Sequence, residues 1–274
     1  MLKQRTLTAL ALAPIAVALI LLLPTTIMAA VAGGLFLLGA WEWARLAGYA
    51  EPSSRAILVV IQAAILVFLW PVSALPAAWY VIGAGIAWWL LALVWLGNFS
   101  WAAAPTRENG LIKLVAGELA IAPAWLAVVT IHGNADHGHW WLLFVLLLVW
   151  AADTFAYFAG RRYGKRKLAP RISPNKTTAG AWGALAGGAL VALVGGWLLG
   201  ARGFALALLF GLSLLTVLAS IVGDLIESLL KRQANVKDSG TFMPGHGGLL
   251  DRMDSLLAAL PVFAAGKALI DLAT

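Results

Sequence analysis

The chain has 274 residues, of which 62% are hydrophobic and 11% are charged, and its formal net charge at pH 7 is +7. A soluble domain carries about 25% charged residues, so this composition excludes an ordinary soluble protein and predicts an integral membrane protein. Cysteine is absent, which excludes disulfides and thiolate metal sites. The cations lie beside apolar segments, which argues against nucleic acid as a partner and favours anionic lipid or nucleotide phosphate.

About nine apolar segments approach or reach the ~20 residues that a membrane-spanning helix needs. The sequence therefore predicts an all-α, polytopic membrane protein that forms a single domain over residues 1–274. The first segment resembles a secretory signal peptide, but its length and its direct continuation into a second apolar run favour a transmembrane helix. The third segment is short and is expected to be tilted or partly interfacial. The predicted spans are Thr6–Leu23, Ile27–Ala44, Ala56–Trp70, Ala77–Leu96, Leu111–Ile131, Trp140–Ala159, Gly180–Leu199, Gly203–Val222 and Ser255–Ala273.

The distribution of lysine and arginine orients these spans. The loops on one side carry Arg202, and Lys267 lies near the same end of the last span. With the N-terminus in the cytoplasm, the cytoplasmic segments hold Lys3, Arg5, Arg45, Arg55, Arg107, the basic stretch 161–176, Lys231, Arg232 and Lys237. This asymmetry satisfies the positive-inside rule. We therefore expect a multi-pass protein of the inner (cell) membrane whose two most charged segments face the cytoplasm, where nucleotides are.

The segment Ser228–Asp254 is the most informative part of the chain. It gathers lysines, arginines, aspartates, His246 and two consecutive glycines in a protein that is otherwise apolar. Ionisable groups at a membrane boundary are energetically expensive, so their concentration in one place indicates a functional site. Lysine and arginine bind phosphate oxygens, carboxylates bind Mg²⁺, and glycine lets the backbone approach a ligand closely. This segment therefore predicts a site for a polyphosphate at the bilayer surface.

Two groups of carboxylates flank the charged loop. On the eighth span, positions i, i+3, i+4 and i+7 share one helical face and hold Asp224, Glu227, Ser228 and Lys231. At the start of the last span, Asp251 and Asp254 repeat the i, i+3 spacing. The alternative interpretation is an interfacial helix end with an internal salt bridge, followed by acidic residues that only complement a helix dipole. Two carboxylate-bearing helix ends around His246, Gly247 and Gly248 favour instead a cation site that Mg²⁺ shares with substrate phosphates.

A second polar group lies between the sixth and seventh predicted spans. Asp153, Tyr157 and Arg161 follow one another at i+4 steps, so they share a helical face. A basic loop then ends in the run Ser173-Pro174-Asn175-Lys176-Thr177, whose hydroxyls, backbone N–H groups and lysine can hold phosphate. Because a carboxylate inside an apolar span needs a partner, we expect Asp153 to face the cations of this loop. The other cations are interpreted as setting topology and binding the lipid surface: Arg162, Lys165, Arg166 and Lys167.

Three further features of the spans are interpreted as structural. Glu118 in the fifth span is expected to pair with a polar group that the sequence does not identify. Small-residue spacing favours close helix packing at Gly183, Gly187 and Gly188. On the far side of the membrane, a polar stretch is interpreted as a solvated loop rather than a zinc site, because it lacks a fixed ligand spacing; it contains His132, Asp136, His137 and His139.

The charged segments resemble the motifs of a known family. The run Ser228-x-x-Lys231-Arg232-x4-Lys237-Asp238-x-Gly240, followed by Pro244-x-His246-Gly247-Gly248-x-x-Asp251-Arg252-x-Asp254, resembles the signature of the phosphatidate cytidylyltransferase (CDP-diacylglycerol synthase) family. The run 173–177 with Gly180 is similar to the second motif of that family, and the nine-span layout agrees over nearly the whole chain. The chain departs at Met243, where a branched aliphatic is usual, and at Thr178-Ala179, where an aromatic and Glu or Gln are frequent.

The resemblance implies Mg²⁺-dependent transfer of a cytidylyl group from CTP to phosphatidate, giving CDP-diacylglycerol and pyrophosphate for phospholipid synthesis. It implies that residues 150–254 carry the catalytic motifs, that Asp224 and Asp251 bind the metal, and that Lys231 and His246 complete the catalytic group. It leaves open a second, monovalent cation such as K⁺, and it implies a homodimer that no residue requires. The implied substrate-binding residues are Asp153, Ser173, Asn175, Lys176, Thr177, Ser228, Arg232, Lys237, Asp238, Gly247, Gly248, Arg252 and Asp254.

Three other functions compete with this interpretation. A CTP-dependent kinase for a polyprenol-type lipid alcohol would need a base for a neutral hydroxyl. The complete run from Lys237-Asp238 to His246-Gly247-Gly248-x-x-Asp251-Arg252-x-Asp254 argues against such a kinase. A transporter would place charges through the bilayer midplane and show inverted repeats, neither of which the sequence has. A homologue that binds nucleotide and lipid without turnover is disfavoured by the intact carboxylate pair.

Overall fold

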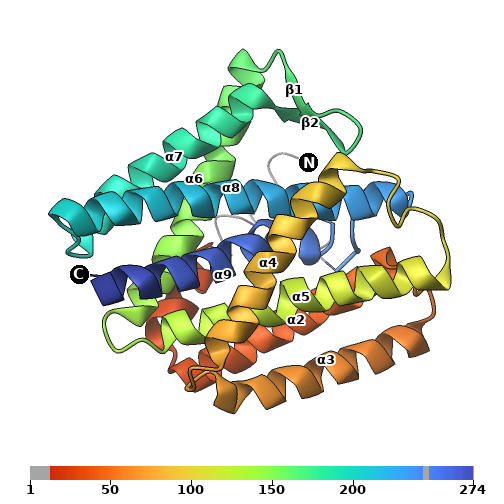
Figure 1. Ribbon diagram of the computed structural model, residues 1–274, viewed down its shortest axis with the longest axis horizontal. Coiled ribbons are helices and arrows are strands. Elements are labelled where there is room, and N and C mark those ends of the chain that lie inside the picture. The colour runs from red at the N-terminus through yellow and green to blue at the C-terminus, as the bar shows by residue number, and fades with distance from the viewer. Residues whose placement is uncertain (1–12, 243–246, 274) are drawn as a thin grey trace.

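The computed structural model describes residues 13–242 and 247–273 (Figure 1). In this part of the chain, eight helices are long and apolar enough to cross a membrane. They are α2 (Thr25–Leu46), α3 (Pro52–Val72), α4 (Ala78–Gly97), α5 (Arg107–His132), α6 (Gly138–Tyr163), α7 (Thr178–Leu198), α8 (Gly203–Gln233) and α9 (Leu250–Ala273). The prediction of an all-α, polytopic membrane protein is confirmed. The first predicted span is described only over Ala13–Leu22, which is helical, so the ninth span and the orientation of the N-terminus stay predictions.

Most of the predicted spans are longer in the structure, α3 and α8 among them. The third was expected to be short, but α3 has 21 residues because Pro52 begins it and the polar residues after that proline continue the helix. The eighth extends eleven residues beyond Val222, since α8 runs to Gln233. This extension places the predicted polar face on the same continuous helix as the apolar span.

A small β-hairpin joins α6 to α7, where sequence analysis expected only a basic loop. Strand β1 (Lys167–Ala169) pairs antiparallel with β2 (Ser173–Thr177), with Lys167 opposite Thr177 and Ala169 opposite Ser173. The hairpin lies above the C-terminal half of α8 in Figure 1. It thereby holds the Ser173–Thr177 run in an extended conformation over the charged end of α8.

Helix α5 lies at the centre of one half of the bundle and packs against α2, α3, α4, α6 and α9. Tryptophan side chains tie this half together by donating to backbone carbonyls of neighbouring helices. The indole N–H of Trp43 on α2 donates to Lys113 O on α5 at 2.7 Å, and that of Trp125 on α5 donates to Ala29 O on α2 at 2.9 Å. Trp89 on α4 donates to Leu257 O on α9 at 3.2 Å. A buried polar contact also joins α3 to α5, and it identifies the expected partner of Glu118 as Gln62, whose amide nitrogen lies 3.4 Å from Glu118 Oε1.

The prediction of a solvated loop around His132 and His139 is partly wrong. His132 is only 1% exposed, and its ring stacks on His139 with 3.9 Å between centroids. His132 Nε2 lies 2.9 Å from Ile20 O, and His139 Nδ1 lies 3.2 Å from Leu21 O. The two rings therefore satisfy carbonyls at the C-terminal end of the first helix, which have no partner within that helix.

The charged ends of the helices meet at one end of the molecule. The C-terminal ends of α2 and α8 and the N-terminal ends of α5 and α9 all lie on the right in Figure 1. Helices α6 and α7 pack against each other and, through α7, against α8. The hairpin between them therefore reaches the same charged region from a different side.

The predicted close packing at glycines is confirmed between α6 and α7. A Cβ on Gly183 would lie 2.5 Å from Ala159 Cβ and 2.6 Å from Phe155 O, and one on Gly187 would lie 2.8 Å from Ala151 O. These positions have backbone as their neighbour, so the helices can only separate to admit a side chain.

Replacing Gly183 by alanine is expected to destabilise the protein by about 1–3 kcal/mol, because the added methyl group overpacks the α6–α7 contact. The matched control is Gly211→Ala on α8, where a Cβ meets nothing within 4 Å. That variant is expected to be neutral or stabilising by about 0.5–1 kcal/mol through helix propensity. Thermal unfolding in detergent, followed by tryptophan fluorescence, compares the two, and equal melting temperatures would contradict the packing argument.

Candidate active site

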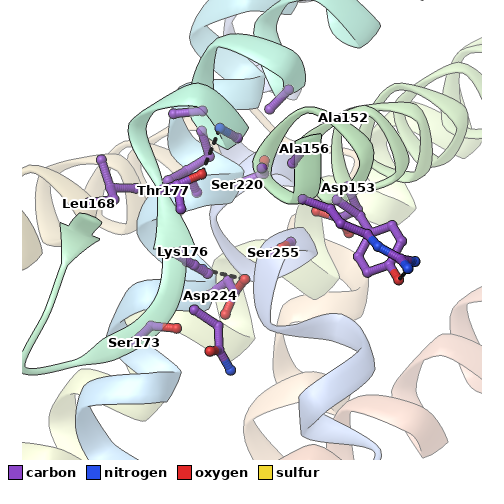
Figure 2. A pocket seen from close by; sticks show the side chains of 18 residues that line it. Ala152, Asp153, Ala156, Leu168, Ser173, Lys176, Thr177, Ser220, Asp224 and Ser255 are labelled. Carbon is purple, nitrogen blue, oxygen red and sulfur yellow. Dashed lines mark hydrogen bonds and ion pairs between the residues drawn. The ribbon is translucent and has the colours of Figure 1, made fainter. Parts of the chain in front are cut away.

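A cavity of about 630 Å³ lies between α6, α7, α8 and the hairpin (Figure 2). Asp153 on α6, Lys176 on β2 and Asp224 on α8 line it, together with Ser255 of α9. We call it the active-site cavity. The structure thus brings residues of both predicted constellations to one place, including Ser173, Asn175, Lys176 and Thr177 of the hairpin.

An ion pair connects the hairpin to α8 inside this cavity. Lys176 Nζ pairs with Asp224 Oδ2, and the two side chains are 24% and 31% exposed. Ser228, one turn further along α8, donates its hydroxyl to Asp224 Oδ1 at 3.4 Å. Because both charged groups keep access to solvent, each can exchange its present partner for a ligand.

Thr177 has a local structural role beside this ion pair. Its side-chain oxygen accepts the backbone N–H of Gly180 at 3.1 Å and so caps the N-terminus of α7. Gly160 and Gly164 of the α6 end approach the same side chain closely. Thr177 therefore fixes the angle at which β2 enters α7 and with it the position of Lys176.

Three carboxylates gather where α8 and α9 meet. One oxygen from each of Asp224, Glu227 and Asp254 lies within 4.8 Å of the others, and among the described residues this is the one group of three metal-ligating side chains. Glu227 and Asp254 are 1% and 9% exposed, and Glu227 Oε1 is buried without a hydrogen-bond partner. Buried carboxylates repel one another unless a cation or protons neutralise them. A hard divalent cation with oxygen ligands, such as Mg²⁺, fits this donor set.

Asp251, the other predicted metal ligand, is surrounded by donors of the protein itself. Its Oδ1 accepts from Lys231 Nζ at 2.6 Å, and its Oδ2 accepts from Gly248 N at 2.8 Å and from Ser239 N and Oγ at 3.1 and 3.0 Å. These bonds fold the loop between α8 and α9 onto the start of α9. Its role as a metal ligand stays a prediction, whereas Asp254, which sequence analysis placed among the substrate-binding residues, lies in the carboxylate cluster.

Lys231 connects the carboxylate cluster to Asp251. Its Nζ lies 2.5 Å from Glu227 Oε2 and 2.6 Å from Asp251 Oδ1, and the side chain is 14% exposed. A buried cation between two carboxylates compensates both charges at close range. The predicted helical face is therefore correct in geometry, and the same contacts show that Lys231 balances charge between α8 and α9.

Glu42 on α2 is a site residue that sequence analysis missed. It is 5% exposed, its Oε1 accepts Leu249 N at 3.1 Å, and its Oε2 accepts Leu250 N at 2.7 Å and the Ser239 hydroxyl at 2.9 Å. The carboxylate thus satisfies N–H groups at the N-terminus of α9, which have no partner within that helix. A signal was present, because Glu42 is an acidic residue inside a predicted membrane span, and such residues are rarely there without a role.

The glycines of the loop fit around Glu42 rather than around a ligand. A Cβ on Gly240 would overlap Glu42 Oε1, and one on Gly248 would overlap Ser239 Oγ and Glu42 Oε2. Gly247 has a φ of +83°, a backbone conformation that side chains with a Cβ rarely adopt. The predicted close approach of this backbone to a ligand stays a prediction, and the described neighbours of these glycines are groups of the protein.

The remaining predicted residues that the structure describes do not line the active-site cavity. The Arg232 Nε–H donates to Ile172 O at 3.2 Å, which ties α8 to the turn of the hairpin. Lys237, Asp238 and Arg252 are exposed. His246 lies outside the described residues, as does the Met243 departure.

Replacing Glu42 by alanine is expected to destabilise the protein by at least about 2 kcal/mol, because two buried backbone N–H groups and Ser239 lose their acceptor. The loop between α8 and α9 should then be cleaved faster by trypsin at Lys237. The matched control is Glu51→Ala, since Glu51 is exposed and makes no side-chain capping bond. Melting temperature and limited proteolysis in detergent measure both effects, and identical behaviour of the two variants would contradict this role.

The geometry can be compared with known proteins. The model of the cytidylyltransferase family matches residues 3–269. The phosphatidate cytidylyltransferase of Pseudomonas aeruginosa is 43% identical, with 97% of this chain and 96% of that protein covered. The proteins of the same name from Haemophilus influenzae and Brucella abortus are 36% and 37% identical, with 96% and 79% of this chain and 98% and 71% of those proteins covered. The resemblance found in the sequence is confirmed, and the chain belongs to the cytidylyltransferase family.

Proposed function

We propose that the protein catalyses Mg²⁺-dependent transfer of a cytidylyl group from CTP to phosphatidate, giving CDP-diacylglycerol and pyrophosphate for phospholipid synthesis. The observation that carries this proposal is the active-site cavity, in which Lys176 of the hairpin meets Asp224 beside a buried carboxylate cluster. A nucleotide triphosphate needs both a cation from the protein and a metal site, and the cavity offers the two side by side. Relatives named phosphatidate cytidylyltransferase support the choice of substrates.

The hairpin is the proposed binding site for the triphosphate. Ser173, Asn175 and Lys176 line the cavity from one extended strand, so hydroxyl, amide and ammonium groups face one space. Lys176 is paired with Asp224 in the structure. A phosphate of CTP would replace Asp224 as the partner of Lys176, and a metal ion would compensate the carboxylate that the lysine leaves. Binding of nucleotide and of metal would then reinforce each other.

Asp224, Glu227 and Asp254 are the residues proposed to hold Mg²⁺. Their oxygens lie close enough to serve one ion, and the buried, unpartnered Oε1 of Glu227 fits a cation better than it fits the apolar interior. Asp251 remains the proposed additional ligand, and K⁺ remains the candidate for a second cation. When bound, Mg²⁺ would neutralise charge on phosphate oxygens during the transfer.

The reaction asks mainly for positioning and charge relief. An oxygen of the phosphatidate phosphate attacks the α-phosphorus of CTP, a new P–O bond forms, and the bond to the β-phosphate oxygen breaks so that pyrophosphate leaves. The attacking oxygen is already anionic at neutral pH, so no strong base is needed. Three exposed cations outside the lining of the active-site cavity are proposed to bind the lipid phosphate and the leaving group; they are Arg232, Lys237 and Arg252. His246 is proposed to position substrate.

The charged helix ends gather at one end of the bundle, where the lysine and arginine of the sequence predict the cytoplasmic side of the inner membrane. A lipid substrate would reach the cavity sideways from the bilayer while CTP enters from the cytoplasm. A homodimer remains proposed from the family resemblance alone.

The test of the reaction uses purified protein in detergent with phosphatidate, Mg²⁺ and CTP labelled at either the α- or the γ-phosphate. Label from the α-phosphate is expected in the lipid fraction, and label from the γ-phosphate is expected in pyrophosphate. Transfer of the γ-label to lipid would instead establish a CTP-dependent lipid kinase. Absence of lipid labelling with both nucleotides would overturn the proposal.

The Asp254→Asn variant tests the proposed metal site and leaves in place the hydrogen bonds by which Asp251 holds the loop between α8 and α9. It is expected to lower kcat by at least about 100-fold and to raise the Mg²⁺ concentration needed for half-maximal activity. Without Mg²⁺, its melting temperature should equal or exceed that of the unmodified protein, because repulsion within the cluster is relieved. Mg²⁺ should raise the melting temperature of the unmodified protein but not that of Asp254→Asn.

Asp251→Asn is expected to abolish turnover and also to lower the melting temperature without Mg²⁺, because it weakens the Lys231 pair and the loop contacts. The exposed Asp136→Asn on the far side serves as the control for both variants. A Mg²⁺-dependent thermal shift that persists in Asp254→Asn at full size would contradict the metal assignment.

A further inference from the structure

A second cavity, of about 710 Å³, opens at the same end of the bundle. It lies between the C-terminal end of α2, the segment that leads into α5, the start of α5 and the end of α8. None of its described lining residues lines the active-site cavity. The two cavities are therefore separate, although α8 contributes to both.

The lining of this cavity carries positive charge only. Arg45 of α2 and Arg107 and Lys113 of α5 line it, and no aspartate or glutamate does so among the described residues. We call it the basic cavity. The active-site cavity, in contrast, balances Arg161 and Lys176 with two aspartates. An anion is thus the ligand that the charge of the basic cavity fits.

Lys113 is the strongest indication of a ligand. It is 5% exposed and lies in the second turn of α5, yet its side chain has no ion pair or hydrogen bond within the described structure. Its position is fixed, because its backbone carbonyl accepts the indole N–H of Trp43 at 2.7 Å. The side chain is largely buried but lines the basic cavity, so its charge is poorly solvated and yet open to a ligand. A bound anion would supply the missing partner.

Two helix ends contribute to the wall of the cavity, and the start of α5 fits an anion. Helix α5 begins at Arg107, directly after the lining residue Thr106, so the positive end of its dipole lies at the cavity wall. Gln233 at the end of α8 donates its amide to Phe99 O and Trp101 O at 2.9 and 3.0 Å, while its Oε1 is buried without a partner.

We infer that the basic cavity binds a phosphate-bearing anion, held by Arg45, Arg107 and Lys113, at a site distinct from the active-site cavity. Such a phosphate can belong to the headgroup of an anionic membrane lipid or to a soluble phosphate compound. The inference does not require the proposed reaction, because it rests on charge and burial around α5. A ligand there would contact both α2 and α8, the helices that carry Glu42 and the carboxylate cluster.

Native mass spectrometry of the full chain in detergent tests the inference with phosphatidylglycerol as the lipid probe and inorganic pyrophosphate as the soluble probe. Arg107→Gln/Lys113→Met is expected to weaken binding of the cognate probe by at least about tenfold, because charge-assisted hydrogen bonds to phosphate are lost. The matched control is Arg202→Gln, which removes one exposed cation directly before the N-terminus of α8, outside both cavities. It should change binding less than about twofold.

Two additional variants make the result unambiguous. Lys176→Met removes the cation of the active-site cavity, so binding that it abolishes belongs there and not in the basic cavity. Arg45→Gln/Arg107→Gln keeps the buried Lys113 and replaces only more exposed cations, so it serves if the first double variant does not fold. Loss of phosphatidylglycerol in the double variants supports a lipid ligand, and loss of pyrophosphate supports a soluble one. Unchanged binding of both probes in the double variants, or no binding to the unmodified protein, would overturn the inference.

Discussion

The carboxylate of Glu42 is the interaction on which the charged end of this protein depends. It comes from α2, far from the motifs in sequence, and accepts hydrogen bonds from the first backbone N–H groups of α9 and from Ser239. This contact fixes where α9 begins and how deeply its first turn lies in the bundle. Gly240 and Gly248 of the loop pack directly against this side chain, where a Cβ would overlap it. The carboxylates of α9 can meet those of α8 only because the helix starts at this place.

Each carboxylate at this end of the molecule has its own kind of partner. Glu42 is neutralised by backbone dipoles, Asp251 by Lys231 and loop donors, and Asp224 by Lys176 of the hairpin. In the innermost pair, Lys231 compensates one oxygen of Glu227, but Glu227 Oε1 has no hydrogen-bond partner and Asp254 forms no ion pair within the described structure. Such an arrangement is costly in an empty protein and favourable when a cation is present. Under the proposed metal assignment, the repulsion between these side chains, which the helices hold together, would favour the binding of a cation.

Much of this organisation could be predicted from local sequence. Apolar length gave the helices, and i, i+3, i+4 spacing placed Asp224, Glu227 and Lys231 on one face, because both depend on residues near one another in the chain. The hairpin was not predicted, since its strands are short and basic rather than alternating. The hydrogen bond from the start of α9 to Glu42 could not be predicted either, and neither could the burial of Lys113 without an ion pair. Both arise from helices that pack side by side although they are distant in sequence.

The tryptophans that join neighbouring helices have a mechanical consequence. Each indole N–H reaches one particular carbonyl, so a slide of one helical turn, about 5.4 Å, would separate donor from acceptor. Helices α2, α4, α5 and α9 are therefore clamped in axial register. In the described structure, the α6–hairpin–α7 unit has no indole–carbonyl bond of this kind to those helices, and α6 instead meets α9 through the rings of Trp141, Phe144 and Phe263.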